Sequence, residues 1–117
     1  MIKTYKNIIA WNKAHELALS VYRLTMSFPV NERFVLVSQI RRSAVSVASN
    51  IVEGFARKSK KESLRFYDYS KASLEELKYQ LFLASELTFI KEKEYNKVEN
   101  LSNEVGRTLN GWIKSQL

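Results

Sequence analysis

The sequence predicts an all-α protein, folded as an up-down-up-down antiparallel four-helix bundle. Its composition favours long uninterrupted elements, because apolar residues make up 45% of the chain and there are only three glycines and one proline. Apolar residues recur at intervals of three and four along four segments, which is the spacing of one helix face. No linker-like, repeated or low-complexity stretch interrupts the 117 residues, so we expect a single domain over residues 1–117.

The first two helices are expected over residues 10–26 and 32–56. Phe28-Pro29 ends the first helix, because the residue before a proline avoids the helical region. Asn31 is expected to cap the second helix through its side-chain oxygen, with Glu32 in the positive first turn. The apolar residues that predict the two core faces are Ala14, Leu17, Val21 and Leu24, and then Val37, Ile40, Ala44, Val47, Ile51 and Phe55.

The third helix is expected from a cap at Ser59 to about residue 89, and the fourth over residues 94–114. Ser59-x-x-Glu62 matches the capping box, in which each side chain bonds the other residue's backbone N–H. Short connections make consecutive helices antiparallel neighbours. The predicted core faces comprise Tyr67, Ser70, Leu74, Leu77, Leu81 and Ala84, and then Tyr95, Val98, Leu101, Val105, Leu109 and Trp112.

The sequence contains no pattern typical of catalysis, cofactor binding or a metal site. The chain has no cysteine, and His15 is its single histidine, which excludes the usual zinc and iron-sulfur ligand sets. We interpret His15 as a partly buried structural residue, since no nucleophile or orienting carboxylate is recognisable beside it. Gly54 is expected to relieve crowding near the end of the second helix rather than to form a phosphate-binding loop. We therefore expect no enzyme.

Two features that the sequence lacks, long apolar segments and cysteine, predict the cellular location of the protein. No apolar stretch is long enough for a signal peptide or for a membrane span. The lack of cysteine fits a reducing compartment. We expect a cytoplasmic protein with no membrane association.

The chain is basic, with nineteen Lys and Arg residues against twelve Asp and Glu residues, a formal net charge of +7. One basic group could neutralise phosphates, while Tyr67 and Tyr69 nearby could stack on bases. RNA and DNA both remain open as ligands, an acidic protein or anionic lipid would attract the same charge, and the charge can also serve solubility alone. The basic group consists of Arg41, Arg42, Arg57, Lys58, Lys60, Lys61 and Arg65.

The third helix carries a second apolar stripe, roughly opposite its core face. A single small bundle cannot bury both sides of a helix, so we expect this stripe to be a homo-oligomer interface. The alternatives are a different partner chain, or scattered surface residues without a function. On the second helix, Ser46 and Ser49 leave room for another helix to approach. The stripe consists of Tyr69, Ala72, Tyr79, Leu83 and Leu87.

Five segments are distinctive when taken together. They are Trp11-x-x-Ala14 with Leu17, Tyr22-x-x-Thr25-x-x-Phe28-Pro29, Gln39-Ile40-Arg41-Arg42-Ser43-Ala44, Ser49-Asn50-Ile51-Val52-Glu53-Gly54, and Ser73-Leu74-Glu75-Glu76-Leu77. Over nearly its whole length the chain resembles a bacterial family of four-helix-bundle proteins, named for members encoded in intervening sequences of 23S ribosomal RNA genes. The resemblance implies a ring-like homopentamer. It also implies kinship with the accessory protein of diversity-generating retroelements, a basic pentamer that partners a reverse transcriptase and nucleic acid.

The resemblance draws attention to polar positions on the second helix, for which we expect hydrogen bonds between helices or between subunits. These positions are Gln39, Arg41, Arg42, Asn50 and Glu53. The function predicted from the sequence is that of a non-enzymatic, homo-oligomeric, basic helical bundle that binds RNA, DNA or a nucleic-acid enzyme such as a reverse transcriptase. The alternative is a protein–protein adaptor with no nucleic-acid role.

Overall fold

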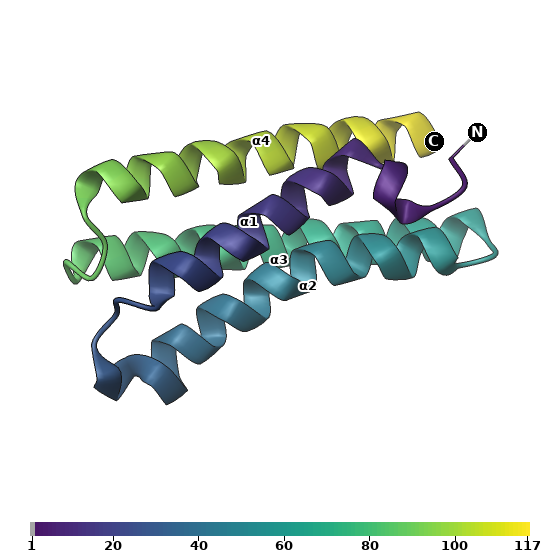
Figure 1. The fold of residues 1–117 in the computed structure, drawn as a ribbon. Coiled ribbons are helices and arrows are strands. Elements are labelled where there is room, and N and C mark those ends of the chain that lie inside the picture. The colour runs from purple at the N-terminus through teal and green to yellow at the C-terminus, as the bar shows by residue number, and fades with distance from the viewer. Residues whose placement is uncertain (1) are drawn as a thin grey trace.

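The computed structural model describes residues 2–117, which form four long helices and no strand. The helices are α1 (Ile9–Thr25), α2 (Ser38–Ala56), α3 (Lys60–Glu86) and α4 (Glu92–Gln116), preceded by a short 3-10 helix, η1 (Tyr5–Asn7). In Figure 1 the α2–α3 turn lies at one end of the bundle, together with the first and last described residues. The α1–α2 and α3–α4 connections lie at the other end. The predicted four-helix bundle is confirmed.

The core is built from the apolar helix faces that the sequence predicts. The predicted core residues that are buried are Ala14, Leu17 and Val21 in α1, Val37, Ile40, Ala44, Val47 and Ile51 in or just before α2, Tyr67, Leu74, Leu77, Leu81 and Ala84 in α3, and Val98, Val105 and Leu109 in α4; Ile8, Ala10, Phe28, Leu36 and Ile90 join them. The remaining predicted members are partly buried against the same core. Ser70 is fully buried, and its hydroxyl donates to the Val47 carbonyl at 2.6 Å, so its polar group is satisfied.

The chain enters α2 differently from the prediction. A π-helical stretch, η3 (Arg33–Val37), occupies the segment where the sequence predicts the first turns of a regular helix, and a 3-10 helix, η2 (Val30–Glu32), precedes it in the predicted connection. Asn31 lies inside η2, and no side chain caps η3 or α2, so the predicted Asn31 cap is wrong. Within η3, Leu36 is buried and Phe34 is 87% exposed.

Gly54 allows α2 and α3 to approach closely near their shared turn. A Cβ atom at this position would lie 2.7 Å from Cδ1 of Tyr67 and 3.0 Å from the carbonyl oxygen of Ser63. The first distance is shorter than real Cβ contacts, and the second is tighter than nearly all of them. The expectation that Gly54 relieves crowding is therefore confirmed, and the residue that needs the space is Tyr67.

α3 ends at Glu86 rather than at the predicted residue 89, because the chain turns there in a Schellman motif. The N–H of Phe89 donates to the Ala84 carbonyl at 2.9 Å, and the N–H of Thr88 donates to the Ser85 carbonyl at 3.0 Å. Thr88 has a φ angle of 62°, in the left-handed region that favours glycine. A β-branched residue is strained there. The turn brings Phe89 back against the core.

Candidate nucleic-acid interface

Five of the predicted basic residues gather around the turn between α2 and α3. Arg57 directly follows α2, Lys58 lies in the turn, Lys60 and Lys61 begin α3, and Arg65 follows one helical turn later. All five side chains are exposed. Because the connection between the helices is so short, their charges emerge from one end of the bundle. We refer to this surface, residues 57–65 with the aromatic side chains beside them, as the cationic end.

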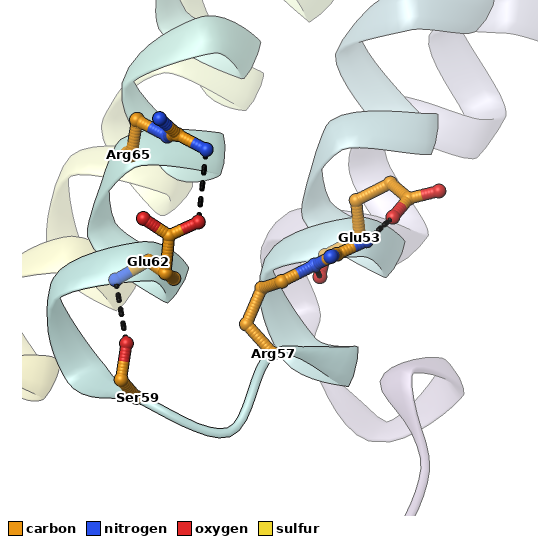
Figure 2. A network of polar contacts seen from close by, with 5 residues as sticks. All are labelled: Glu53, Arg57, Ser59, Glu62 and Arg65. Atoms are coloured by element: carbon orange, nitrogen blue, oxygen red, sulfur yellow. Dashed lines mark hydrogen bonds and ion pairs between the residues drawn. The ribbon is translucent and has the colours of Figure 1, made fainter.

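Ion pairs partly compensate two of these cations (Figure 2). Glu53 pairs with Arg57 in the last turn of α2, and Glu62 pairs with Arg65 at 2.8 Å in the first turns of α3. All four side chains are between 40% and 53% exposed. Such exposed pairs stabilise a protein by only about 0–1 kcal/mol, so they orient the arginines more than they hold the fold.

The lysines of the cationic end are less compensated. Lys60 donates from Nζ to the main-chain oxygen of Leu117 at 2.7 Å. Among the ion pairs of residues 2–117, none involves Lys58 or Lys61. These two ammonium groups therefore carry positive charge near the turn that no ion pair offsets.

The predicted capping box at the start of α3 is half formed. The N–H of Glu62 donates to Oγ of Ser59 at 3.1 Å, which confirms Ser59 as the N-cap. The Glu62 carboxylate does not return the bond to Ser59 but accepts from Arg65, as Figure 2 shows. Arg65, one turn further along α3, binds the Glu62 carboxylate in place of the Ser59 backbone N–H.

Phe66 is an aromatic residue of the cationic end that the sequence analysis did not single out. The guanidinium groups of Arg57 and Arg65 lie 4.6 Å and 5.7 Å from its ring centroid, and Tyr69 meets it edge to face at 5.5 Å. Tyr69 is 46% exposed and is free to stack on a base, whereas Tyr67 is only 2% exposed. The idea that Tyr67 stacks on bases is wrong. The i, i+3 spacing of Phe66 and Tyr69 was the signal that could have found this pair.

Arg41 and Arg42 do not belong to the cationic end. They lie near the start of α2, and the sixteen residues from Arg41 to Arg57 correspond to about 24 Å along a helix. Arg41 instead links α2 to α1: its Nε donates to Oγ1 of Thr25 at 2.9 Å, and its Nη2 donates to the Tyr22 carbonyl at 3.2 Å. The structure thus divides the predicted basic group into two sites.

The remaining polar positions of the family resemblance make local contacts or none. Asn50 donates to Oγ of Ser46 at 2.9 Å, within α2, and Glu53 pairs within the same helix. Gln39 and Arg42 are exposed. Of the five, Arg41 is the residue that bonds a neighbouring helix.

Serine side chains connect α2 to α3. The hydroxyl oxygens of Ser46 and Ser73 lie 2.8 Å apart, and Ser43 donates to the Glu76 carboxylate at 3.1 Å. The room that Ser46 leaves is therefore filled by α3 of the same chain.

The predicted oligomer stripe on α3 is largely on the surface. Tyr79 is 62% exposed, Leu87 47% and Tyr69 46%, and Ala72 is exposed too. Leu83 is partly buried against the core of its own bundle, so it contributes less to this surface.

A second apolar surface, between α1 and α2, was missed by the sequence analysis. Leu19, Tyr22 and Val45 are each about 42–43% exposed there and line a hollow of about 430 Å³ whose lining includes no Asp, Glu, Lys or Arg. Tyr22 lies at helical spacing beside the predicted core face of the first helix, and that spacing alone favoured its burial. The spacing of Leu19 and Tyr22 was compatible with that interpretation, because periodicity gives the direction of a face but not where burial stops.

Groups capable of chemistry are sparse in the described part of the chain. Within residues 2–117, no three His, Asp or Glu side chains gather to hold a metal ion. His15 is exposed and stacks on Trp11 with ring centroids 5.0 Å apart, so the prediction of a partly buried histidine is wrong. Burial raises the pKa of Tyr67, and the neighbouring Trp112 side chain partly offsets that rise.

No helix between residues 2 and 117 has the length and apolar character needed to cross a membrane.

The helices and their surfaces define a class, that of basic four-helix-bundle proteins with a cationic, aromatic-bearing end. Residues 6–111 match the family described as 23S rRNA-intervening sequence protein. The chain belongs to this family, which confirms the resemblance found in the sequence.

A solved structure supports the same assignment. It is a protein of unknown function from the S23 ribosomal protein family of Bacteroides thetaiotaomicron VPI-5482, which is 29% identical to this chain and superimposes with a TM-score of 0.82. The similarity covers 91% of this chain and 99% of the other. A search of curated proteins gives no match. Neither description indicates an enzymatic family.

Proposed function

We propose that this chain is a non-enzymatic, homo-oligomeric, cytoplasmic protein whose cationic end binds RNA or DNA, alone or together with a nucleic-acid enzyme such as a reverse transcriptase. The observation that carries the proposal is the grouping of uncompensated lysines, Lys58 and Lys61, with the exposed ring of Tyr69 on one end of the bundle. Cations that neutralise phosphates and a ring that stacks on bases are the two parts of a single-strand binding surface.

The exposed apolar surfaces support the oligomer. Tyr79 and Leu87 on α3, and Leu19 and Val45 between α1 and α2, lie on two different faces of the bundle. Two distinct apolar surfaces on one small protein suit head-to-tail contacts between copies, which close into a ring when the rotation permits. The pentamer implied by the family resemblance is an assembly of this kind. It would repeat the cationic end five times.

The deciding experiment is the mass of the purified protein by light scattering, at 50 mM and 300 mM salt, with and without a short mixed-sequence RNA that lacks a 5′-phosphate. We expect an oligomer at both salt concentrations and added RNA mass only at the lower one, because phosphate contacts weaken steeply with salt. A monomer would contradict the oligomer, and RNA binding that ignores salt would contradict the cationic end.

Matched charge variants locate the contact. Lys58→Ala with Lys61→Ala removes the two uncompensated lysines, and Lys91→Ala with Lys93→Ala removes two exposed lysines near the start of α4, at the opposite end. The first pair is expected to weaken RNA binding at least tenfold and to lower the salt slope by about two. The second pair is the control and is expected to change binding much less.

The alternative function is that of a protein–protein adaptor with no nucleic-acid role. The exposed Tyr79 and Leu87 on α3 favour it, since a different chain can cover them as well as a second copy can. An oligomer that remains indifferent to RNA at every salt concentration would support the adaptor and reject the nucleic-acid role.

A further inference from the structure

A hollow of about 600 Å³ opens at the cationic end, between the end of α2, the start of α3 and the last turns of α4. Arg57, Lys58 and Lys60 line it, and its lining includes no Asp or Glu. The nearest carboxylates in sequence, Glu53 and Glu62, are each paired with an arginine. The charges around the hollow therefore favour an anion.

Two buried polar groups also line this hollow. Tyr67 is 2% exposed, yet its side chain forms part of the lining. Trp112 also lines the hollow, and its buried indole Nε1 has no partner within strict hydrogen-bond geometry, although it lies near enough to the Tyr67 hydroxyl to lower the pKa of that group. The two rings are neighbours, with centroids 6.0 Å apart. The hollow therefore places the Tyr67 side chain, whose hydroxyl can donate a hydrogen bond, beside the cationic side chains.

The start of α3 adds backbone donors on the same side. The first hydrogen bond of this helix runs from the N–H of Ser63 to the carbonyl of Ser59, and the Glu62 N–H is taken by the Ser59 cap. The amides of Lys60 and Lys61 precede that first bond and have no partner inside the helix. The positive end of the dipole of this 27-residue helix lies at the same place.

We infer that this hollow binds the terminal phosphate monoester of a nucleic-acid strand, an inference that rests on the proposed function. Lys58 and Lys60 neutralise its charge, and the free amides at the start of α3 and the Tyr67 hydroxyl donate to its oxygens. Gly54 also lines the hollow, and a Cβ atom at this position would press on the Tyr67 ring.

A terminal phosphate suits the hollow better than an internal one. A phosphate monoester carries about 1.5 to 2 negative charges at neutral pH and three strong acceptor oxygens. An internal phosphodiester carries one charge, and its strand must leave the hollow in two directions. Three elements of the fold surround the hollow, which accommodates a strand end more readily than a continuous strand.

The first test compares two oligonucleotides of one sequence, one with a 5′-phosphate and one with a 5′-hydroxyl, by fluorescence anisotropy at fixed salt. We expect the phosphorylated strand to bind about tenfold more tightly, the effect of one or two charge-assisted hydrogen bonds. Equal affinities for the two strands would overturn the inference while leaving the proposed function intact. Inorganic phosphate and a nucleoside monophosphate are added as competitors. They distinguish a site for any phosphate from one that also needs the base and the strand.

Variants separate the hollow from the general charge of the protein. Tyr67→Phe removes one hydroxyl from the lining and is expected to reduce the preference for the phosphorylated strand several-fold, with little effect on the hydroxyl strand. Tyr79→Phe on the exposed face of α3 is its control. Unfolding curves of both variants check that the fold is retained. An unchanged preference in Tyr67→Phe and in Lys58→Ala with Lys60→Ala would overturn the site.

If neither strand binds, the proposed function fails, and the hollow is then tested alone. A nucleoside monophosphate is titrated while the amide NMR signals of residues 57–63 and the indole signal of Trp112 are followed. Saturable shifts confined to these signals, reduced in Tyr67→Phe, would support a phosphate site without a nucleic-acid partner. The absence of such shifts up to 10 mM ligand would reject it.

Discussion

The two ends of the bundle present different surfaces. At the α2–α3 end, a short turn, the Ser59 cap and the contact between Gly54 and Tyr67 hold the helices in a regular arrangement that exposes lysines and arginines. At the opposite end, the chain passes through 3-10 and π-helical turns, and Val30 and Phe34 are 80% and 87% exposed. The cationic end presents its charges from regular helices, whereas the opposite end, which also carries exposed lysines, presents exposed apolar side chains from irregular backbone.

This difference indicates how one small bundle can serve two kinds of partner. A phosphate-binding surface needs donors held at fixed positions, which regular helices supply. Apolar contacts are less directional, so an irregular segment can carry them. The following predictions test whether the two ends differ in this way, from the largest expected effect to the smallest.

Gly54→Ala tests the packing of the cationic end. The added methyl group would press on the buried Tyr67 ring and on the Ser63 carbonyl, so we expect a loss of about 2–3 kcal/mol in the free energy of unfolding. Urea denaturation measures it. Gly106→Ala is the control, because its Cβ would meet only Leu74 Cδ2, at 3.5 Å. That variant should be stabilised by about 0.5–1 kcal/mol through helix propensity. Equal effects at the two positions would contradict the close approach.

Arg41→Ala tests the contact between α1 and α2 near the end of the bundle opposite the cationic end. It removes two hydrogen bonds, to Thr25 and to the Tyr22 carbonyl, and the contact of the guanidinium with the Tyr22 ring at 4.5 Å. We expect the free energy of unfolding to fall by about 1–2 kcal/mol. Arg42→Ala removes the same charge from an exposed neighbour and should change stability by less than about 0.5 kcal/mol. A larger effect for Arg42 in the oligomer would instead place that residue at a subunit contact.

Thr88→Gly tests the strained turn between α3 and α4. Glycine adopts the positive φ angle of this position without a steric penalty, so the variant should be more stable by about 1 kcal/mol. Thr88→Ala keeps a Cβ atom and should gain much less. Thermal unfolding of both variants provides the measurement, and a destabilised glycine variant would show that the Thr88 side chain contributes more than its strain costs.

Alkaline pH tests the buried hydroxyl of the cationic end. Burial raises the pKa of Tyr67 above its ordinary value of 10.0. The folded state therefore holds this proton more tightly than the unfolded state, and the associated stability is present below pH 10 and falls as pH rises above it. Tyr67→Phe should make the decline above pH 10 shallower. Tyr95 and Lys13, whose pKa values are also raised, titrate in the same range, so some decline should remain. If stability declined identically above pH 10 in the wild-type protein and in Tyr67→Phe, the raised pKa of the Tyr67 hydroxyl would be contradicted.

The sequence predicted the helices and their core faces because burial imposes the 3.6-residue period on the chain. Val47 and Leu77, for example, are fully buried as their spacing predicts. It succeeded at the Ser59 cap of α3 but failed at the start of α2 and at the end of α3. The turn at Thr88 contains no glycine, the residue that usually indicates a positive φ angle at a helix end. The π-helical entry to α2 has the same apolar spacing as a regular helix, so periodicity does not distinguish the two.

The candidate site was predicted less completely for a different reason. Nearness in sequence suggested one basic group, but a helix separates Arg41 from Arg57 by about 24 Å. The roles of individual aromatic residues also depended on which face each one occupies. Tyr67 is buried, whereas the ring of its neighbour Phe66 contacts the guanidinium groups of Arg57 and Arg65. A one-residue step of about 100° around a helix makes this difference.

The serine contacts between α2 and α3 have a consequence for the order in which the molecule assembles. Ser43 and Ser46 meet α3 residues 27 to 33 positions away, across a very short turn, so closing this hairpin loses little chain entropy. By contrast, the pairing of α1 with α4 joins the two ends of the chain. We expect the α2–α3 hairpin to form early in folding and α4 to dock last. Stopped-flow kinetics would then give high φ values for Val47→Ala and low ones for Leu109→Ala. A nascent chain could thus display the cationic end before its bundle is complete.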